Sequence, residues 1–281
     1  MNTPLRLNGV HHSARPTWKL RETMEFYRDK MGLPLVHCVS ARGWGPSDHP
    51  DFLHFFFDSG NGSTIAFFYY LGDDQPEHLI HRPEYDNDAI HTSWRVETRE
   101  ELLAWRKRLE DNGVSIMYQI EHEVVESIYF RDPNGYYLEI GRPVREFQSL
   151  DGSDSAATLE AALAAEAASA AKGERLKDIE SVWNAKGLAL DKQFGLPPGL
   201  RIYVPDFPEF KPFLEGAAQA GDCRICAPEH GYWRIEADAE IRFQRKEIGL
   251  GPALWNSALA GGFCGKIAEY GRDLMRLVPA Q

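Results

Sequence analysis

The sequence predicts an α+β fold in which paired βαβββ modules form a curved mixed sheet around a cleft, followed by a mainly helical C-terminal region. Two observations lead to this prediction. A strand–helix–strand–strand–strand pattern occurs twice in the N-terminal half, and each copy carries a histidine at a matching place on its first strand, His12 and His91. Such self-similarity indicates a duplicated unit, and two units of this kind would each form a curved sheet, which together enclose the cleft.

The first module begins with a strand over Leu7–Ala14. A helix over Lys19–Met31 follows, because apolar residues recur on one face at helical spacing, and Gly32 supplies its end. Three extended segments complete the module: Leu33–Val39, Phe52–Phe57 and Thr64–Leu71. A turn-forming run of Asp, Ser, Gly and Asn separates the last two segments.

The second module repeats this order. Ala89–Val96 is predicted to be a strand, and Thr98 with Glu101 forms a capping box that opens a helix reaching about Glu110. The remaining strands are expected at Val114–Gln119, Val124–Phe130 and Tyr136–Ile140, with a turn at Asp132–Gly135 between the last two. Phe26 follows His12 at the spacing with which Trp105 follows His91, which supports the duplication.

The chain therefore divides into a domain at 1–148, with modules at about 5–72 and 88–145, and a region of unknown role at 149–281. In the second region, the Ala-rich Ser153–Lys172 is expected to be a helical, solvated linker. A Pro-rich irregular segment, a strand and an amphipathic helix should follow at Leu196–Pro212, Tyr232–Gln244 and Pro252–Leu277. We see no catalytic constellation there and expect it to cover the cleft or form a subunit interface.

Composition narrows the function. The net charge of −11 argues against nucleic acid and anionic membranes as partners. No apolar run is long enough to span a bilayer, and the N-terminus lacks a signal sequence, so we expect a cytoplasmic protein. The four cysteines are too few for a disulfide framework, and the single pair Cys223 and Cys226 has no second pair nearby to complete a zinc site.

Three residues are candidate metal ligands: His12, His91 and Glu139. The two histidines occupy matching strands, and Glu139 lies within the otherwise apolar run Tyr137–Ile140. A carboxylate there costs several kcal/mol unless it is paired or metal-bound. The pseudo-symmetry of the modules would bring the three residues to one cleft.

The segments His12–Leu33, Ile90–Val114 and Ser127–Pro143 resemble the vicinal oxygen chelate superfamily, which includes glyoxalase I, methylmalonyl-CoA epimerase, bleomycin resistance proteins and type I extradiol dioxygenases. The resemblance covers about residues 5–145. The segment Ile120–Glu139, I-E-H-E-V-V-E-S-I-Y-F-R-D-P-N-G-Y-Y-L-E, further resembles the extradiol dioxygenase signature, with His122 and Tyr129 on its fixed positions.

The resemblance implies an Fe(II)-dependent, extradiol-type dioxygenase that acts on a catecholic or related aromatic substrate with O2. His12, His91 and Glu139 would hold the metal, with Mn(II) as an alternative. His122 would hydrogen-bond or exchange protons with a substrate oxygen, and Tyr129 would hold the same group. Phe55–Phe57 and Phe67–Tyr70 are candidates for aromatic walls that exclude water. A homo-oligomer is expected.

Three departures from the patterns of the family members keep alternatives open. Glyoxalases and epimerases have a fourth ligand, Glu or Gln, where this chain has Ala66, which favours an open triad of the Fe(II) oxygenase kind. Many extradiol enzymes have an acid–base histidine where this chain has Ser63, and they carry two such domains in tandem. A glyoxalase-type lyase or isomerase using Zn, Ni, Co or Mn, and a non-enzymatic binding or resistance protein, are therefore the alternative functions.

Four other histidines need to be placed. His11 should point to the face opposite His12 if the strand is regular. His54 could replace the missing acid–base histidine only if it faces the cleft, which the sequence leaves open. His78 and His81, between the modules, are expected to be solvated.

Overall fold

A computed structural model describes residues 7, 9–30, 33–44, 49–60, 62–77, 91–131, 137–220 and 222–280. The chain forms two compact units: one comprises residues 1–37 and 53–152, and the other comprises 38–52 and 153–281. Among the described residues, no helix is both long and apolar enough to cross a bilayer. His78, His81 and the turn at Asp132–Gly135 lie outside the described residues.

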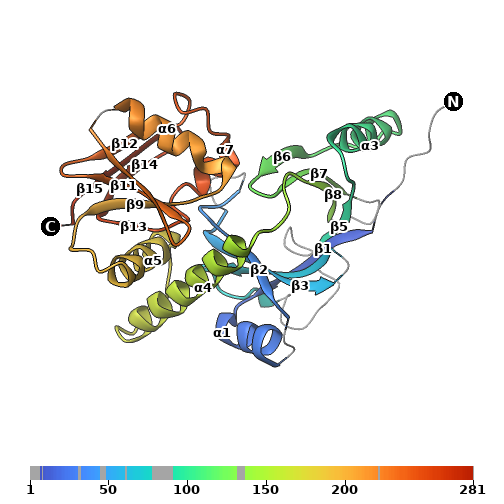
Figure 1. Ribbon diagram of the computed structural model, residues 1–281. Helices are drawn as coiled ribbons and strands as arrows, with labels where there is room; N and C mark the ends of the chain where they lie inside the picture. The colour runs from blue at the N-terminus through green and yellow to red at the C-terminus, as the bar shows by residue number, and fades with distance from the viewer. Residues whose placement is uncertain are drawn as a thin grey trace. The chain divides into compact units, whose positions relative to one another are not determined.

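An eight-stranded mixed sheet, strongly curled, dominates the first unit (Figure 1). Its strands are β1 (Val10–Thr17), β2 (Leu35–Ala41), β3 (Phe52–Gly60), β4 (Ser63–Tyr70), β5 (His91–Arg95), β6 (Tyr118–His122), β7 (Val125–Arg131) and β8 (Tyr137–Pro143). The strand order is β2-β3-β4-β1-β5-β8-β7-β6, so each module contributes four adjacent strands. β1 pairs with β4 in parallel and β5 pairs with β8 in parallel, while β1 and β5 join the modules antiparallel. The predicted fold class of this region is confirmed.

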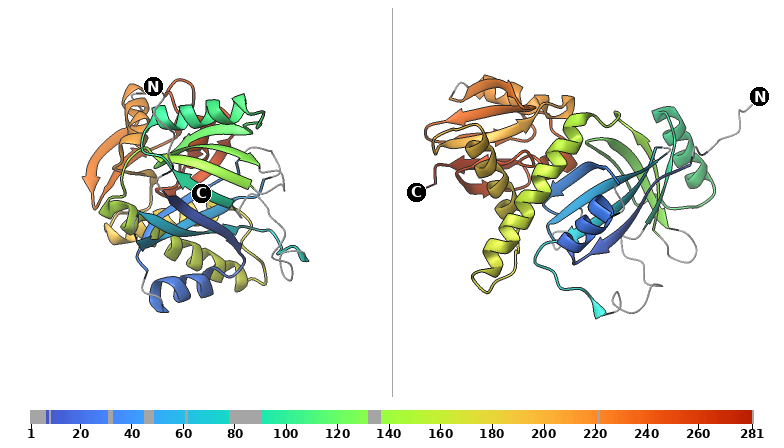
Figure 2. Two further views of the ribbon diagram at one scale, coloured as in Figure 1. Left: turned by 90° about the vertical axis from the view of Figure 1, so that its right-hand side faces the viewer. Right: turned by 60° about the horizontal axis from the view of Figure 1, so that its bottom comes forward.

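Helices cover the convex face of the sheet. In the first module, α1 (Leu20–Met24) runs into a π-helical turn, η1 (Glu25–Lys30), and lies over the first half of the sheet (Figure 2). Tyr27 in this segment packs on Phe57 and Phe67. In the second module, α3 (Arg99–Asp111) begins with the capping box predicted at Thr98 and Glu101.

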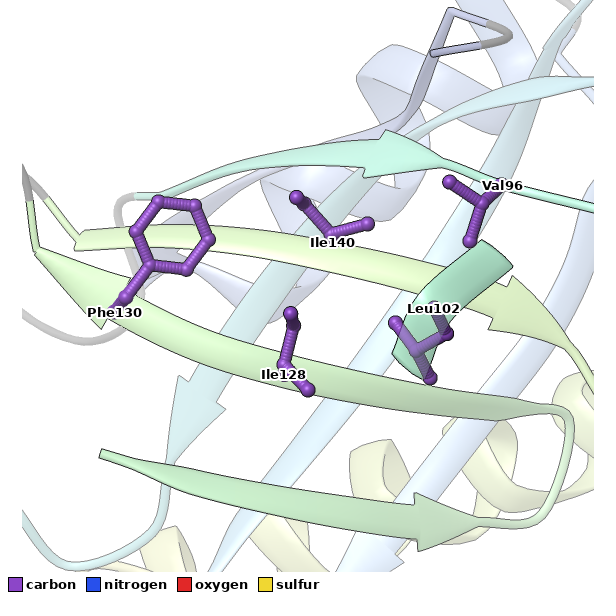
Figure 3. Packing of buried hydrophobic residues seen from close by; sticks show 5 residues of the cluster. All are labelled: Val96, Leu102, Ile128, Phe130 and Ile140. Carbon is purple, nitrogen blue, oxygen red and sulfur yellow. The ribbon is translucent and has the colours of Figure 1, made fainter. Parts of the chain in front are cut away.

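The core under α3 shows that core residues and candidate site residues alternate along the same strands and so lie on opposite faces of the sheet. Val96, Leu102, Ile128, Phe130 and Ile140 form one buried cluster on the convex side (Figure 3). Because side chains alternate along a strand, the residues next to Ile128 and Ile140, namely Tyr129 and Glu139, lie on the concave face. Helix packing against one face therefore leaves the other face available for a site.

The second unit contains more β-structure than the sequence predicts. Its elements are α4 (Ser149–Ala170, which begins in the first unit), α5 (Ile179–Gln193), β9 (Leu200–Pro205), η2 (Pro208–Phe210), α6 (Lys211–Ala220), β10 (Arg224–Glu229), β11 (Tyr232–Ala237), β12 (Ile241–Gln244), α7 (Pro252–Asn256), β13 (Phe263–Cys264), β14 (Lys266–Tyr270) and β15 (Leu274–Val278). Two small sheets form, ordered β10-β11-β9-β13 and β12-β15-β14.

Three predictions for this unit need correction. The expected solvated linker is α4, whose Leu159, Ala161 and Ala162 are buried, so it is a packed helix. The expected irregular segment Leu196–Pro212 contains the buried strand β9. The helix expected over Pro252–Leu277 ends at Asn256, because the rest pairs as short strands in the two sheets. The prediction of a mainly helical C-terminal region holds only for the first part of this unit. The strand expected at Tyr232–Gln244 is present as β11 and β12.

Candidate metal centre

Three central strands bring the predicted metal ligands together. His12 comes from β1, His91 from β5 and Glu139 from β8, and one ligand atom from each lies within 4.8 Å of the others. The Nε2 atoms of His12 and His91 are 3.1 Å apart, and Oε2 of Glu139 lies 2.9 Å from His91 Nε2 and 3.7 Å from His12 Nε2. All three side chains are buried. The site thus consists of two imidazoles and one carboxylate converging on one point.

The spacing and chemistry of these donors fit a metal ion. Ligand atoms about 2.1 Å from one ion and at right angles to each other lie roughly 3 Å apart, close to the observed separations. Burial lowers the pKa of His12 well below its usual value, so its imidazole is neutral, the form that binds metals. Burial by itself would raise the pKa of Glu139, but His12, His91 and Ser127 outweigh it and hold that pKa below its usual range. The donors are therefore the neutral imidazole of His12, the imidazole of His91 and one carboxylate.

Neighbouring side chains orient the ligands. The Ser127 hydroxyl, on β7, donates a hydrogen bond to Oε1 of Glu139, which leaves Oε2 facing the histidines. His11 Nδ1 lies 2.8 Å from Nδ1 of His12. With Nε2 of His12 supplying a lone pair to the centre, its Nδ1–H is the donor in this contact. Such outer contacts fix the tautomer and the ring orientation of a ligand.

The position of His11 departs from the prediction. A regular strand would place His11 on the face opposite His12, yet both side chains are buried and in contact. The register of β1 against β5 shifts between Val10 and His12, so a bulge interrupts the alternation there. The strand is not regular, and His11 supports His12.

No described side chain supplies a fourth ligand from the symmetric strand. The register β5–β8 pairs Ser93 with Glu139, and the register β1–β4 pairs Ala14 with Ala66. Ala66 is fully buried and offers only a methyl group. Ser63, at the place where many extradiol enzymes have histidine, donates a hydrogen bond to the carbonyl of Val10.

His54 faces the centre, which answers the question left open by the sequence. Its ring centroid lies 6.0 Å from that of His12, and it stacks on Phe68 at 3.7 Å. The ring nitrogen Nδ1 donates to the carbonyl of Phe67, 3.2 Å away, so Nε2 carries the lone pair in the neutral ring. Phe56, 5.4 Å from His12, completes this side of the centre.

The aromatic wall is thinner than predicted. Phe56 and Phe68 lie beside the histidines, but Phe55, Phe57 and Phe67 pack with one another or with Tyr27 on the convex side. The cause is strand alternation, which sends neighbouring residues of a run to opposite faces.

The two predicted catalytic residues lie near the triad. Tyr129 pairs in register with Glu139, and its ring centroid lies 6.4 Å from that of His91. Burial and the adjacent Glu139 raise the pKa of Tyr129 well above its usual value, so the phenol is neutral. His122 ends β6, is buried, and burial lowers its pKa although Glu139 and Glu123 oppose this. Both side chains are therefore uncharged groups on the concave side.

His37 forms a buried ionic cluster that was not predicted from the sequence. Its Nε2 lies 3.3 Å from Oε2 of Glu123 and its Nδ1 lies 3.6 Å from Oδ1 of Asp151. Burial opposes its charge, but these two carboxylates raise the pKa of His37 to about 9. The alternation of β2 could have indicated an inward histidine, but its acidic partners are distant in sequence.

The geometry defines a protein with a duplicated βαβββ sheet and a His, His, Glu centre on the concave face. Residues 9–140 match the family model of the Glyoxalase/Bleomycin resistance protein/Dioxygenase superfamily. This part of the chain therefore belongs to that superfamily, which includes extradiol dioxygenases, glyoxalases and epimerases and consists mostly of metal-dependent enzymes. The family relationship predicted from the sequence is confirmed for this region.

Several solved structures are similar. Methylmalonyl-CoA epimerase from Mycobacterium tuberculosis is 19% identical with a TM-score of 0.38, over 52% of this chain and 93% of that one. The 2,3-dioxygenase LapB from Pseudomonas sp. KL28 is 19% identical with a TM-score of 0.33, over 47% and 41%. Lactoylglutathione lyase from Agrobacterium tumefaciens is 19% identical with a TM-score of 0.19, over 48% and 93%. A comparison with curated proteins gave no match.

Proposed function

We propose that this protein is an Fe(II)-dependent, extradiol-type dioxygenase that cleaves a catecholic or related aromatic ring with O2. The observation that carries the proposal is the donor set: two histidines and one glutamate converge, and the symmetric strand has Ala66 at the place that corresponds to Glu139. Two histidines and one carboxylate with open positions are typical of non-haem Fe(II) oxygenases. Mn(II) could occupy the same ligand set.

The metal, when bound, supplies the redox chemistry that couples a catechol to O2. The protein residues position the substrate and move its protons. His122 hydrogen-bonds to a catechol oxygen and exchanges a proton with it, a role that suits a buried neutral imidazole. Tyr129, a neutral phenol, donates a hydrogen bond to the same oxygen. Phe56 and Phe68 restrict water on the His54 side of the centre.

Metal analysis of anaerobically purified protein, followed by oxygen uptake with a panel of catechols, tests this function. We expect stoichiometric iron and substrate-dependent O2 consumption, both lost in His12→Ala. The matched control is His230→Ala, which removes an exposed histidine of the second unit and should leave both unchanged. Bound metal without O2 uptake for any catechol would contradict the proposal and favour a lyase or isomerase. Absence of metal from protein offered Fe(II) anaerobically would favour a binding protein.

A further inference from the structure

A cavity of about 480 Å³ opens on the first unit. Thr64 and Arg95 line it together with Gly62, Val124 and Phe147. The volume falls within the range of small-molecule sites. Apart from the first turn of α4 and the segment that leads into it, the lining comes from strands of the curled sheet and the turns that join them.

Strand register places this cavity on the same face as the metal ligands. Arg95 follows His91 by two alternations along β5, so both side chains leave the same side of the strand. Thr64 is the register partner of His12 in the parallel β1–β4 pair. Pro143 stands in the same relation to Glu139 on β8 as Arg95 does to His91, and it also lines the cavity. Arg95, Thr64 and Pro143 therefore line the cavity from the same face of the sheet that carries the metal ligands.

Two of the residues that line this cavity each have a buried polar atom with no hydrogen-bond partner among the described residues. These atoms are Nε of Arg95 and the hydroxyl oxygen of Thr64. Leaving a buried donor unsatisfied costs about 1–3 kcal/mol, more for a charged group. That two residues with such donors line one cavity, on the face that carries the metal ligands, indicates a ligand with acceptor oxygens.

The two arginines of the cavity differ in availability. Arg145 makes two hydrogen bonds to the carboxylate of Asp151, both 2.8 Å long, so that guanidinium is already engaged. Among the described residues, Arg95 contacts carboxylates only through Nη2, at 3.0 Å from Glu97 and 3.6 Å from Glu146. Those two side chains are 47% and 81% exposed, and such surface pairs contribute little. Arg95 is thus the cation that can bind a ligand.

We infer that this cavity is a carboxylate-binding subsite in which the Nε–H of Arg95 and the hydroxyl of Thr64 donate to the two oxygens of a substrate carboxylate. The inference rests on the proposed function and deepens it, because the substrate becomes an aromatic compound with an acidic side chain. Hydrogen bonds between a guanidinium and a carboxylate are about twice as strong as neutral ones, so the subsite discriminates against uncharged analogues.

Binding measurements with matched acid and amide ligands test the subsite. The pairs are phenylacetate with phenylacetamide, and 3,4-dihydroxyphenylacetate with its amide, titrated into the protein as isolated under anaerobic conditions. We expect the acid of each pair to bind about 10-fold or more tightly to the wild-type protein. Arg95→Gln should reduce this preference to within about 2-fold, and Thr64→Val should reduce it by less.

Two further variants control the test. Arg95→Lys keeps the charge but lacks the Nε–H, so it should retain only part of the preference and serves if the glutamine variant is poorly folded. Arg99→Gln removes the same charge from a side chain that is 58% exposed, and should keep the full preference. Thermal unfolding of each variant verifies that it folds.

The outcomes separate the subsite from the proposed reaction. Equal binding of acid and amide, no binding of either, or a preference that survives in Arg95→Gln would overturn the subsite, whether or not catechols consume O2. A preference that depends on Arg95, with no O2 uptake from any catechol, would support the subsite and contradict the dioxygenase reaction.

Discussion

Both units of the chain bury a cluster of ionisable side chains, but the two clusters are built in opposite ways. In the first unit, the ligand atoms of His12, His91 and Glu139 converge on one point, with no lysine or arginine among them. In the second unit, Lys186 is 1% exposed and supplies a cation from within the chain. Comparing the two clusters shows how a candidate binding site differs from a structural hydrogen-bond network.

The cluster around Lys186 satisfies itself. Its ammonium group donates to Oδ1 of Asp154 at 2.6 Å, to the hydroxyl of Thr158 at 2.8 Å and to the carbonyl of Ala260 at 2.8 Å. The hydroxyl of Tyr232 donates to the same Asp154 oxygen at 2.7 Å. Three donor hydrogens meet three acceptors, so the network needs no ligand.

The difference shows that burial of charged residues does not by itself mark a functional site. What marks one is an excess of acceptors or donors over their complements. The triad gathers three metal-ligand atoms and fits a cation, while the Arg95 cavity is lined by two residues with unpartnered donors among the described residues and fits an anion. The Lys186 network is balanced, and its role is to hold the second unit together.

Removing a triad ligand should produce the largest effect. In His91→Ala, we expect metal affinity to fall by more than the about 100-fold that loss of an outer partner costs, because one of three protein ligands is lost. The midpoint of unfolding of metal-free protein should fall, because the buried carboxylate of Glu139 loses its partner 2.9 Å away. Metal titration and thermal unfolding of the metal-free form measure the two effects. Normal metal affinity in this variant would mean that the triad is not a metal site, and that both clusters are structural.

Breaking the Lys186 network should affect stability instead of metal binding. Lys186→Met leaves Asp154 buried without its cation, and loss of one partner of a buried pair costs about 3–5 kcal/mol. Urea unfolding measures the loss, with Lys192→Met, at an exposed position, as the control. We expect the metal content of the folded fraction to stay at the wild-type value. A loss of metal without a loss of stability would contradict the structural role.

A third ionic cluster, around His37, tests the comparison through pH. Glu123 and Asp151 raise the pKa of His37 from 6.5 to about 9, and Asp151 is also bound by Arg145. A raised pKa contributes stability that is complete below the unfolded value of about 6.5 and is lost as the pH rises through the folded value. The shift corresponds to about 3 kcal/mol.

The free energy of unfolding, measured by urea at several pH values for wild type and His37→Gln, checks this expectation. The difference between the two proteins should be largest near pH 6 and decline toward pH 10. His11 and His122 also face His37, and burial lowers the pKa of both, so they should remain neutral over this range. A difference independent of pH would mean that His37 is neutral in the folded protein.

Features carried by local pattern could be predicted from the sequence, and those set by distant pairing could not. The modules were predictable because each strand and helix has its own period, and Glu139 because a carboxylate interrupts an apolar strand. His11 was misplaced because a bulge depends on the partner strand. The segment after Pro252 was misassigned because its strands, of two to five residues, gain their hydrogen bonds from β9 and β12. The pairing of His37 with Glu123 and Asp151 likewise follows from tertiary structure alone.

The smallest expected effect concerns Ser127, which contacts Oε1 of Glu139 and not the oxygen that faces the histidines. Its hydroxyl donates to Oε1 of Glu139, and replacing such an outer partner weakens metal binding by about 10–100-fold. Ser127→Ala should therefore retain the metal at saturating concentration but release it in a competition with a chelator that wild-type protein withstands. Ser127→Thr keeps the hydroxyl and should recover most of the affinity. The variant must fit its added methyl group beside Gly141, where a Cβ on the glycine would come within 2.7 Å of Ser127 Oγ. If Ser127→Ala binds metal as tightly as wild type, the strand alone orients Glu139, and the triad binds its metal without help from the Ser127 hydroxyl.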